Sequence, residues 1–119
     1  MNKSSKQDER ISKMTFASVD PHYINKVTKK ERTMEELHTV IEWLTGMNKA
    51  AIQQTISDQL TFEEFFTKYT LNENAVLITG SICGYKVQEI ENSLTKKVRM
   101  LDKLVDELAK GKSLENILR

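Results

Sequence analysis

The chain has 119 residues and a formal net charge of +1, with 39% hydrophobic and 29% charged residues. This composition is typical of a globular protein, and the length suits one domain with its own core. The longest purely apolar run covers residues 75–78, whereas a membrane-spanning helix needs roughly 18 apolar residues. The N-terminus lacks a signal-peptide core. We therefore expect a cytoplasmic protein with one helical domain over residues 1–119, a flexible tail over residues 1–7 and no membrane partner.

Basic residues are concentrated near the N-terminus. Residues 1–32 contain eight Lys or Arg and four Asp or Glu, whereas residues 33–119 contain ten and thirteen. Nucleic-acid-binding domains usually have an isoelectric point above about 9, but this chain has one near 7.8. Nucleic acid is therefore disfavoured as a partner. A weak nucleic-acid-binding surface would have to combine two basic groups on one face, namely residues 26–32 and the set Lys96, Lys97, Arg99 and Lys103.

Helix-start signals divide the first half of the chain into short helices. Asp8 is a candidate N-cap for a first helix that carries Ile11. The pair Asp20-Pro21 combines an N-cap residue with proline at the first helical position. This pair predicts a second helix that begins at Pro21 and has Tyr23 on its apolar face.

Two capping boxes mark the next helices, because Thr33 and Thr61 are each followed three residues later by glutamate. The first of these helices has apolar residues at helical spacing and ends at Gly46, which suits a left-handed C-cap. A weaker helix is expected over residues 48–60. The second capping box opens a helix with an aromatic stripe that predicts core contacts, formed by Phe62, Phe65, Phe66 and Tyr69.

The C-terminal third has the most regular pattern. Its apolar residues alternate in steps of four and three over about two heptads, and this seam consists of Leu94, Val98, Leu101, Val105 and Leu108. A free-standing coiled coil usually needs roughly three or four heptads, so the seam would dock on the domain's own core or on a second subunit. The partner expected from the pattern is a second copy, bound through this seam or an adjacent face. A short turn over residues 113–118 would cover the end of the seam.

Residues 74–90 are ambiguous, because glycines and β-branched residues weaken a helix there. We favour a helix over residues 74–83 that ends at Gly84, and a small β-hairpin near residues 76–90 is the alternative. Gly80 and Gly84 would then share one helix face and allow a close helix contact. The predicted fold class is all-α, a compact bundle of about six short helices with a longer C-terminal helix.

The segment LITGSICGYKV (residues 77–87) contains the only cysteine but matches no catalytic loop. A phosphate-binding loop needs a lysine directly after its second glycine, whereas one tyrosine separates Gly84 from Lys86. A nucleophile elbow needs serine at the centre of G-x-S-x-G, where this chain has Ile82. We interpret Cys83 as a buried small hydrophobe. The alternative is a reactive thiol with Lys86 and a histidine near it.

The sequence does not indicate a metal site. Glu35 and His38 form one Glu-x-x-His element, whereas helical di-iron sites use two such elements and further glutamates. We expect no cofactor, and without a complete catalytic constellation we favour a protein that is not an enzyme. A ligand pocket of aromatic and polar residues is one interpretation of the remaining candidates, and an edge of the core is the other. These candidates are His22, Tyr23, Arg32, Trp43, Cys83 and Lys86.

Five segments resemble the bacterial family of domain of unknown function 2200. In order along nearly the whole chain they are ISKMTFASVDPHYINKV, RTMEELHTVIEWLTG, TFEEFF, LITGSICGYKVQEIE and RMLDKLVDELAKGKSLENILR. The resemblance implies a small cytoplasmic bacterial protein with no established activity, cofactor or catalytic residue. The family often has glycine where Glu31 stands and proline where Glu73 and Ser93 stand. These positions fall at expected helix boundaries, so the departures concern the rigidity of turns.

Three functional hypotheses follow. The leading one is a non-enzymatic binding or interaction module that self-associates. The alternative is a thiol-dependent enzyme or small-ligand binder that uses Cys83, and rapid alkylation of the thiol at neutral pH would distinguish it. The third is weak nucleic-acid binding through the two basic groups, which predicts an affinity that falls steeply with added salt.

Overall fold

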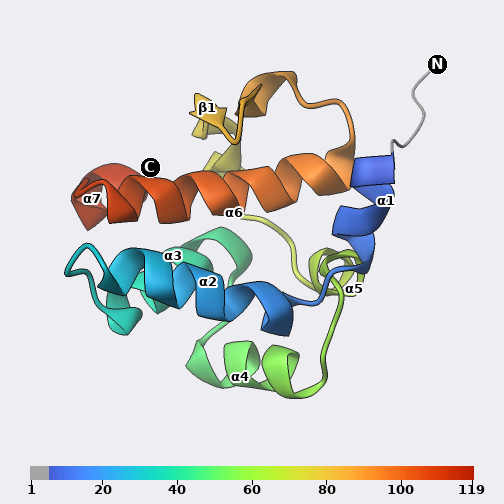
Figure 1. Cartoon of the computed structure of the whole chain (residues 1–119), viewed down its shortest axis with the longest axis horizontal. Coiled ribbons are helices and arrows are strands. Elements are labelled where there is room, and N and C mark those ends of the chain that lie inside the picture. Colours follow the sequence, from blue (N-terminus) through green and yellow to red (C-terminus); the bar gives the residue numbers. More distant parts are fainter. Residues whose placement is uncertain (1–5) are drawn as a thin grey trace.

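A computed structural model describes residues 6–119, and residues 1–5 lie outside the described part (Figure 1). The α-helices of the described part are α1 (Lys6–Lys13), α2 (Phe16–Thr28), α3 (Met34–Thr45), α4 (Lys49–Ser57), α5 (Phe62–Lys68), α6 (Ser93–Ala109) and α7 (Leu114–Ile117). Two 3-10 helices, η1 (Glu73–Leu77) and η2 (Val87–Glu89), flank a small antiparallel sheet of β1 (Ser81–Ile82) and β2 (Tyr85–Lys86). The fold is a helical bundle with one short hairpin, which confirms the predicted fold class.

The long helix α6 is the central element of the bundle. It contacts α1, α2, α3, α5 and α7, and it also contacts β1 and η2. In Figure 1 α6 runs across the middle of the molecule, with α2, α3 and α4 on one side and the hairpin on the other. Segments that are far apart in the sequence therefore cover α6 from two sides.

Capping residues stand at the starts and ends of several helices, as predicted. The side chains of Thr33 and Thr61 accept hydrogen bonds from the N–H groups of Glu36 and Glu64, and each glutamate carboxylate accepts a hydrogen bond from the backbone N–H of its threonine. Gly46 ends α3 in the left-handed conformation, with a φ of 78°. These contacts satisfy backbone groups that the helices themselves leave without partners.

The core lies where the apolar faces of the shorter helices meet α6. The seam of α6 docks on the domain's own core, and its residues Val98, Leu101, Val105 and Leu108 are at most 5% exposed. The same core contains the aromatic rings of α2 and α5, which pack in stacked and edge-on pairs and belong to Phe16, Phe62, Phe65 and Phe66. A second copy bound through the seam stays a prediction, although these four residues already have their contacts within the chain.

The start of α2 differs from the prediction. The pattern places a helix start at Asp20-Pro21, but α2 begins at Phe16, after the N-cap Thr15. The earlier start is set by long-range contacts, because the Phe16 N–H donates to the Leu60 carbonyl and the Phe16 ring is fully buried. Pro21 therefore lies inside the helix, where its missing N–H removes one intrahelical hydrogen bond. The burial of Phe16 outweighs this local cost.

Two further helix boundaries are shifted. The first helix begins at Lys6, before the predicted N-cap Asp8, so part of the predicted tail is helical and residues 1–5 of it lie outside the described residues. The helix expected over residues 48–60 ends at Ser57, because Gln59 adopts a φ of 51° that a right-handed helix does not contain.

The preferred helix over residues 74–83 is wrong, and the hairpin alternative is confirmed. The 3-10 helix η1 is followed by an antiparallel pair in which Ser81 lies opposite Lys86 and Ile82 lies opposite Tyr85. The segment therefore changes from helical to extended backbone before it reaches the cysteine.

Positive φ angles explain why a helix does not continue here. The two turn residues Cys83 and Gly84 have φ values of 52° and 84°, and Gly80 has a φ of 108°. A two-residue hairpin turn of type I′ requires positive φ at both central positions, whereas a right-handed helix excludes it. Gly80 and Gly84 thus do not share a helix face. Cys83 is exposed in the turn, which corrects the expectation that it is buried.

Two of the departures expected from the resemblance lie where the structure accommodates a proline. Glu73 and Ser93 are the first residues of η1 and α6. At the first position of a helix the backbone N–H has no intrahelical partner, so a proline there loses no hydrogen bond.

The third departure, Glu31, predicts a stabilising substitution. Glu31 has a φ of 63° in the turn between α2 and α3, and a non-glycine residue in this region costs roughly 1–2 kcal/mol. The freedom of glycine in the unfolded chain offsets part of the gain. We expect Glu31→Gly to raise the free energy of unfolding by about 1 kcal/mol, measured by urea denaturation.

Gly46 provides the matched control in the opposite direction. Its φ is also positive, and a Cβ added to it would meet no atom within 4 Å. Gly46→Ala therefore changes only the backbone preference and should lower stability by about 1 kcal/mol. If Gly46→Ala behaves in this way while Glu31→Gly is neutral or destabilising, Glu31 is not strained.

Candidate binding site

The N-terminal half of α6 borders a cavity of about 570 Å³. Ligand pockets usually measure roughly 300–1,000 Å³, so the volume suits a small molecule. The cavity lies between α6, α1, the hairpin and the segment that leads into α6. Its lining consists of Gln7, Asp8, Gly84, Tyr85, Lys86, Glu89, Ile90, Glu91, Asn92, Thr95 and Arg99. We name it the Arg99 cavity.

Arg99 is a largely buried cation in the cavity wall. Its side chain is 13% exposed, and its Nη1 donates a hydrogen bond of 3.1 Å to Asp102 Oδ2. The guanidinium carbon lies 5.6 Å from the centroid of the Tyr85 ring, which is a cation–π distance. The Nε atom is buried and has no hydrogen-bond acceptor within residues 6–119. Buried donors are nearly always hydrogen-bonded in proteins, so this N–H group is the unusual feature of the wall.

Asp102 links Arg99 to α2, because each of its two carboxylate oxygens accepts a hydrogen bond. While Oδ2 accepts from Arg99, Oδ1 accepts a hydrogen bond of 2.5 Å from the hydroxyl of Tyr23 on α2. Burial, together with the adjacent Asp102 carboxylate, raises the pKa of Tyr23 well above its ordinary value of 10. The hydroxyl therefore stays a hydrogen-bond donor at neutral pH. The contacts from Tyr23 through Asp102 to Arg99 join the buried face of α2 to the cavity wall.

Hydrogen bonds also hold α1 and the hairpin at the rim of the cavity. The Tyr85 hydroxyl donates to Gln7 Oε1 over 2.9 Å. The Thr95 hydroxyl donates to Asp8 Oδ1 over 2.6 Å, and the Thr95 N–H donates to the side chain of the N-cap Asn92. The walls of the cavity are thus linked to one another by side chains.

The lining carries charges of both signs. Lys86 and Arg99 are basic, whereas Asp8, Glu89 and Glu91 are acidic. A simple anion would be repelled by the acidic groups, but a small zwitterion can place its carboxylate near the basic residues and its ammonium near the acidic ones. No histidine or cysteine lines the cavity, and residues 6–119 contain no cluster of three metal-ligating side chains. This arrangement suits the binding of a small polar molecule.

The six residues of the predicted pocket do not lie together in the structure. Lys86 lines the Arg99 cavity, and Tyr23 supports Arg99 through Asp102. Arg32 lies at the other end of α6, where it contacts the carbonyl oxygen of Leu108.

The other three candidates lie outside the lining of the cavity. His22 is exposed on α2, and Trp43 on α3 is half-buried against the core. Cys83 is exposed in the hairpin turn, directly before a residue of the lining. The sequence pattern missed Arg99, which appeared there only as one of several basic residues. Its link to Tyr23 joins residues far apart in the chain, so no local pattern reveals it.

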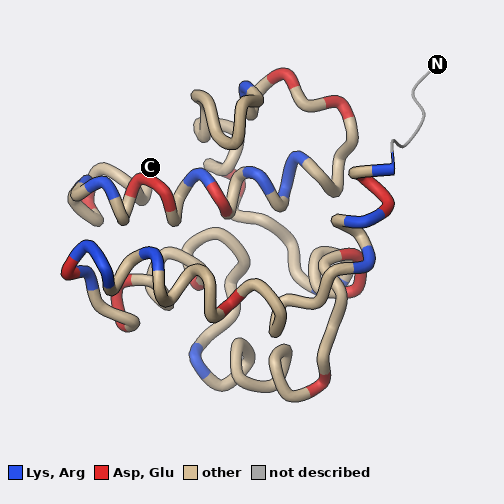
Figure 2. Tube along the Cα trace, in the orientation of Figure 1, with Lys and Arg blue, Asp and Glu red and all other residues tan. Residues whose placement is uncertain are grey.

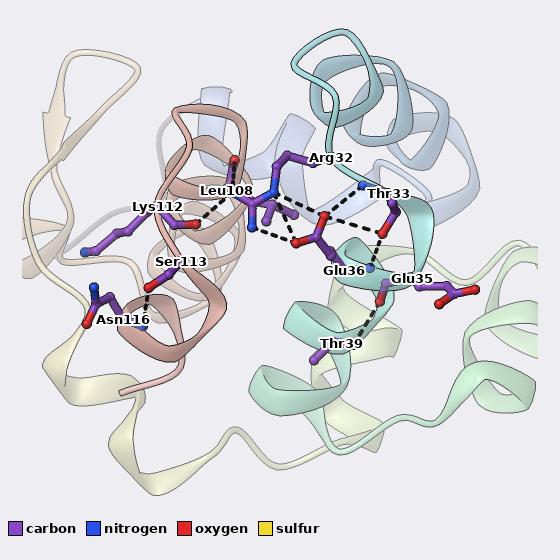
Figure 3. A network of polar contacts seen from close by, with 9 residues as sticks. All are labelled: Arg32, Thr33, Glu35, Glu36, Thr39, Leu108, Lys112, Ser113 and Asn116. Carbon is purple, nitrogen blue, oxygen red and sulfur yellow. Dashed lines mark hydrogen bonds and ion pairs between the residues drawn. The ribbon is translucent and has the colours of Figure 1, made fainter.

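Arg32 ties the turn between α2 and α3 to the C-terminal end of α6 (Figure 3). Its Nε and Nη2 form a bidentate pair with Glu36, in which Nη2 lies 2.7 Å from Oε2. Its Nη1 donates to the carbonyl oxygens of Leu108 and Lys112 over 3.2 Å and 2.8 Å. A cation at the C-terminal end of a helix also interacts favourably with the helix dipole. These contacts give Arg32 a structural role.

The pair of Arg32 and Glu36 predicts an acid-sensitive contribution to stability. The hydrogen bonds from Arg32 lower the pKa of Glu36 from 4.5 to about 2. Because the folded-state pKa is lowered, this contribution is present above pH 4.5 and is lost as the pH falls towards 2. We expect Glu36→Gln to flatten the decline of the unfolding free energy across this interval, measured by urea denaturation at a series of pH values.

The neighbouring Glu35 provides the control for this measurement, because it is exposed in the same helical turn. Glu35→Gln should keep the steep decline of the parent chain. Equal slopes in the two variants would show that Glu36 does not carry the effect.

Comparison with known protein families identifies one family that this chain matches. The family described as "uncharacterized protein conserved in bacteria (DUF2200)" matches residues 10–119. The chain belongs to this family. The structure of this chain is similar to the crystal structure of uncharacterized protein SP1917, with a TM-score of 0.86 and 36% sequence identity. The match covers 98% of this chain and 94% of that chain. No protein of curated function matches the chain.

The family match confirms the resemblance that the five sequence segments indicate, and it brings no activity to this DUF2200 protein. Within residues 6–119, no helix combines the length and the apolar character needed to cross a membrane.

Proposed function

We propose that this DUF2200 protein is a non-enzymatic binding module whose Arg99 cavity holds a small zwitterion, such as a free amino acid. The observation that supports this function is the buried Nε–H of Arg99, which has no acceptor within residues 6–119. The side chain lies in the wall of a cavity of ligand size and donates to Asp102, which in turn accepts a hydrogen bond from Tyr23. Such a rigidly supported cation is what a binding site for a carboxylate requires.

The chain contains an example of the contact that we propose. Arg32 offers its Nε and Nη2 to the carboxylate of Glu36 as a bidentate edge. Arg99 uses Nη1 for Asp102, so the same Nε–Nη2 edge makes no hydrogen bond within the described residues. A ligand carboxylate on this edge would satisfy the buried donor with two parallel hydrogen bonds.

We infer that Tyr85 moves to give a ligand access to this edge, because the Nε atom is buried and the Tyr85 ring lies next to the guanidinium. Tyr85 belongs to a hairpin with strands of two residues, and it is 45% exposed. The bound zwitterion would replace the ring on the guanidinium, and its ammonium would lie near Glu89 and Glu91. Both of these carboxylates are exposed residues of the lining.

The structure gives less support to thiol chemistry. Cys83 is exposed in the turn, but its thiol makes no hydrogen bond to a base within the described residues, and neither histidine lines the adjacent cavity. A nucleophilic cysteine needs such a base or a nearby cation to form its thiolate. The alkylation experiment remains the test of this alternative.

Nucleic-acid binding is also weakly supported, because Arg32 of the first basic group lies far from Lys96 of the second. Arg32 contacts α6 at Leu108, which is about 18 Å along the helix axis from Lys96. Figure 2 shows Lys and Arg interleaved with Asp and Glu along α6. Several of the cations are paired within the chain, among them Lys26 with Asp106 and Arg99 with Asp102.

The ligand proposal predicts binding of free amino acids to the ¹⁵N-labelled chain. Each L-amino acid of a panel is added at about 1 mM, which detects ligands that bind with a free energy of roughly −4 kcal/mol or better. Some members of the panel should shift the amide signals around Arg99. Analogues that lack either the carboxylate or the ammonium should bind at least tenfold more weakly. The reason is that each loses one of its two charge contacts.

Variants test the roles of individual side chains. Arg99→Lys keeps the charge but removes the bidentate edge, so it should weaken binding at least tenfold, whereas Lys49→Gln on the distant helix α4 should not. Tyr23→Phe leaves the lining unchanged but frees Asp102, and it should weaken binding less than Arg99→Lys does. If no amino acid shifts the signals of the parent chain, or if Arg99→Lys binds as tightly as the parent, the proposed function is wrong.

A further inference from the structure

A second hollow of about 480 Å³ lies on another face of α6. Its floor includes Ser93, Lys96, Lys97 and Met100 of α6, which recur at the spacing of one helix face. The opposite wall comes from η1, from the residues beside it and from Gln88 of η2. We name this hollow the α6–η1 groove. It differs from the Arg99 cavity in its lining and in its chemistry.

The wall formed by η1 exposes apolar side chains. Val76, which lines the groove, is 74% exposed, and its neighbour Leu77, which lies outside the lining, is 55% exposed. These two residues account for half of the large hydrophobic residues that the described chain leaves exposed. Their neighbours Ala75 and Ile78 are buried and anchor the segment to the core. The exposed pair is therefore held in place at the surface. Contiguous exposed apolar groups of this kind often mark interaction sites.

The charge of the groove has one sign. Lys96 and Lys97 line it, and no aspartate or glutamate does. Both lysines are half-buried, so their aliphatic stems lie along the apolar surface while the ammonium groups reach the rim. Neither forms an ion pair within residues 6–119, in contrast to Lys110 of the same helix, which pairs with Asp106. The groove thus combines an apolar wall with two cations that have no ion-pair partner within residues 6–119.

We propose that the α6–η1 groove is a docking site for an acidic amphipathic helix of a partner protein. Apolar side chains of that helix would enter the groove beside Val76, and its carboxylates would pair with Lys96 and Lys97. Recognition of an amphipathic helix by an apolar groove is a recurrent mode of peptide binding, and opposite charges at the rim select the partner. This inference does not depend on the ligand proposed for the Arg99 cavity.

Charge favours this occupant over a second copy of the chain. In a symmetric dimer the same patch lies on both sides of the interface, so a dimer centred on the groove would bring the two pairs of Lys96 and Lys97 towards each other. Like charges across an interface oppose association. A stable dimer also needs roughly 800 Å² of surface from each subunit, whereas the exposed apolar surface of η1 is limited to Val76 and Leu77.

Synthetic peptides test the proposal. The acidic probe is a helical peptide with leucines at i, i+3, i+4 and i+7 and glutamates at its other positions, and the matched basic probe has lysines in place of the glutamates. Titration into the ¹⁵N-labelled chain should shift signals of η1 and of the first turns of α6 with the acidic probe. The basic probe should bind at least tenfold more weakly, and added salt should weaken binding of the acidic probe.

Variants identify the surface that is responsible. The double variant Lys96→Glu and Lys97→Glu, and separately Val76→Asp, should each weaken binding of the acidic probe at least tenfold. These are surface positions, and a thermal melt of each variant verifies folding. Lys49→Glu on the distant α4 is the charge control, and Arg99→Lys separates this groove from the Arg99 cavity. Neither of these two should change binding of the acidic probe.

Three outcomes would overturn the proposal. Equal binding of the acidic and basic probes would mean non-selective apolar adhesion, and the absence of shifts at η1 and α6 would mean that the groove is not a docking site. A dimer in analytical ultracentrifugation that Val76→Asp dissociates would show that a second copy occupies the groove in place of an acidic partner.

Discussion

The burial of the C-terminal half of α6 is the constraint on which the rest of the fold depends. Every residue from Leu104 to Ala109 is buried, including Asp106 and Glu107. Burial of the apolar residues of such a helix stabilises the fold. Its buried charged residues need partners of opposite charge, because an unpaired buried charge is strongly destabilising. Both carboxylates have cationic partners. Burial alone would raise the pKa of Asp106, but hydrogen bonds from Lys110 and Lys26 hold it below its ordinary value.

The need for these partners explains why distant parts of the chain meet at this end of α6. Lys26 comes from α2, and Arg119, at the C-terminus, approaches Glu107 to 2.7 Å. Arg32 brings the turn before α3 to the same place, where it contacts backbone carbonyls of the helix end. These ion pairs constrain the packing, because each partner must lie within reach of a buried carboxylate of α6. The C-terminal half of α6 is consequently filled by the fold's own contacts.

The N-terminal half of α6 is covered less completely, and both hollows lie there. The segment from η1 to η2 approaches α6 through a few anchors, among them Ala75, Ile78 and Val87, each at most 4% exposed. Between these anchors the segment leaves space on either side. One space contains Arg99 and charges of both signs, and the other contains apolar groups with Lys96 and Lys97. One helix therefore serves as a structural axis at its C-terminal end and offers two chemically different surfaces at its N-terminal end.

Local patterns predict the helical class, the capping boxes at Thr33 and Thr61 and the apolar seam of α6, because these features depend on residues within a few positions of one another. The start of α2 depends on long-range packing, since burial of Phe16 prevails over the local signal of Asp20-Pro21. The tertiary structure also shows that residues 80–86 form a hairpin, which places Cys83 at the surface. The support of Arg99 by Asp102 and Tyr23 joins α6 to α2. Such a contact arises from the packing of distant segments, and no spacing along the chain encodes it.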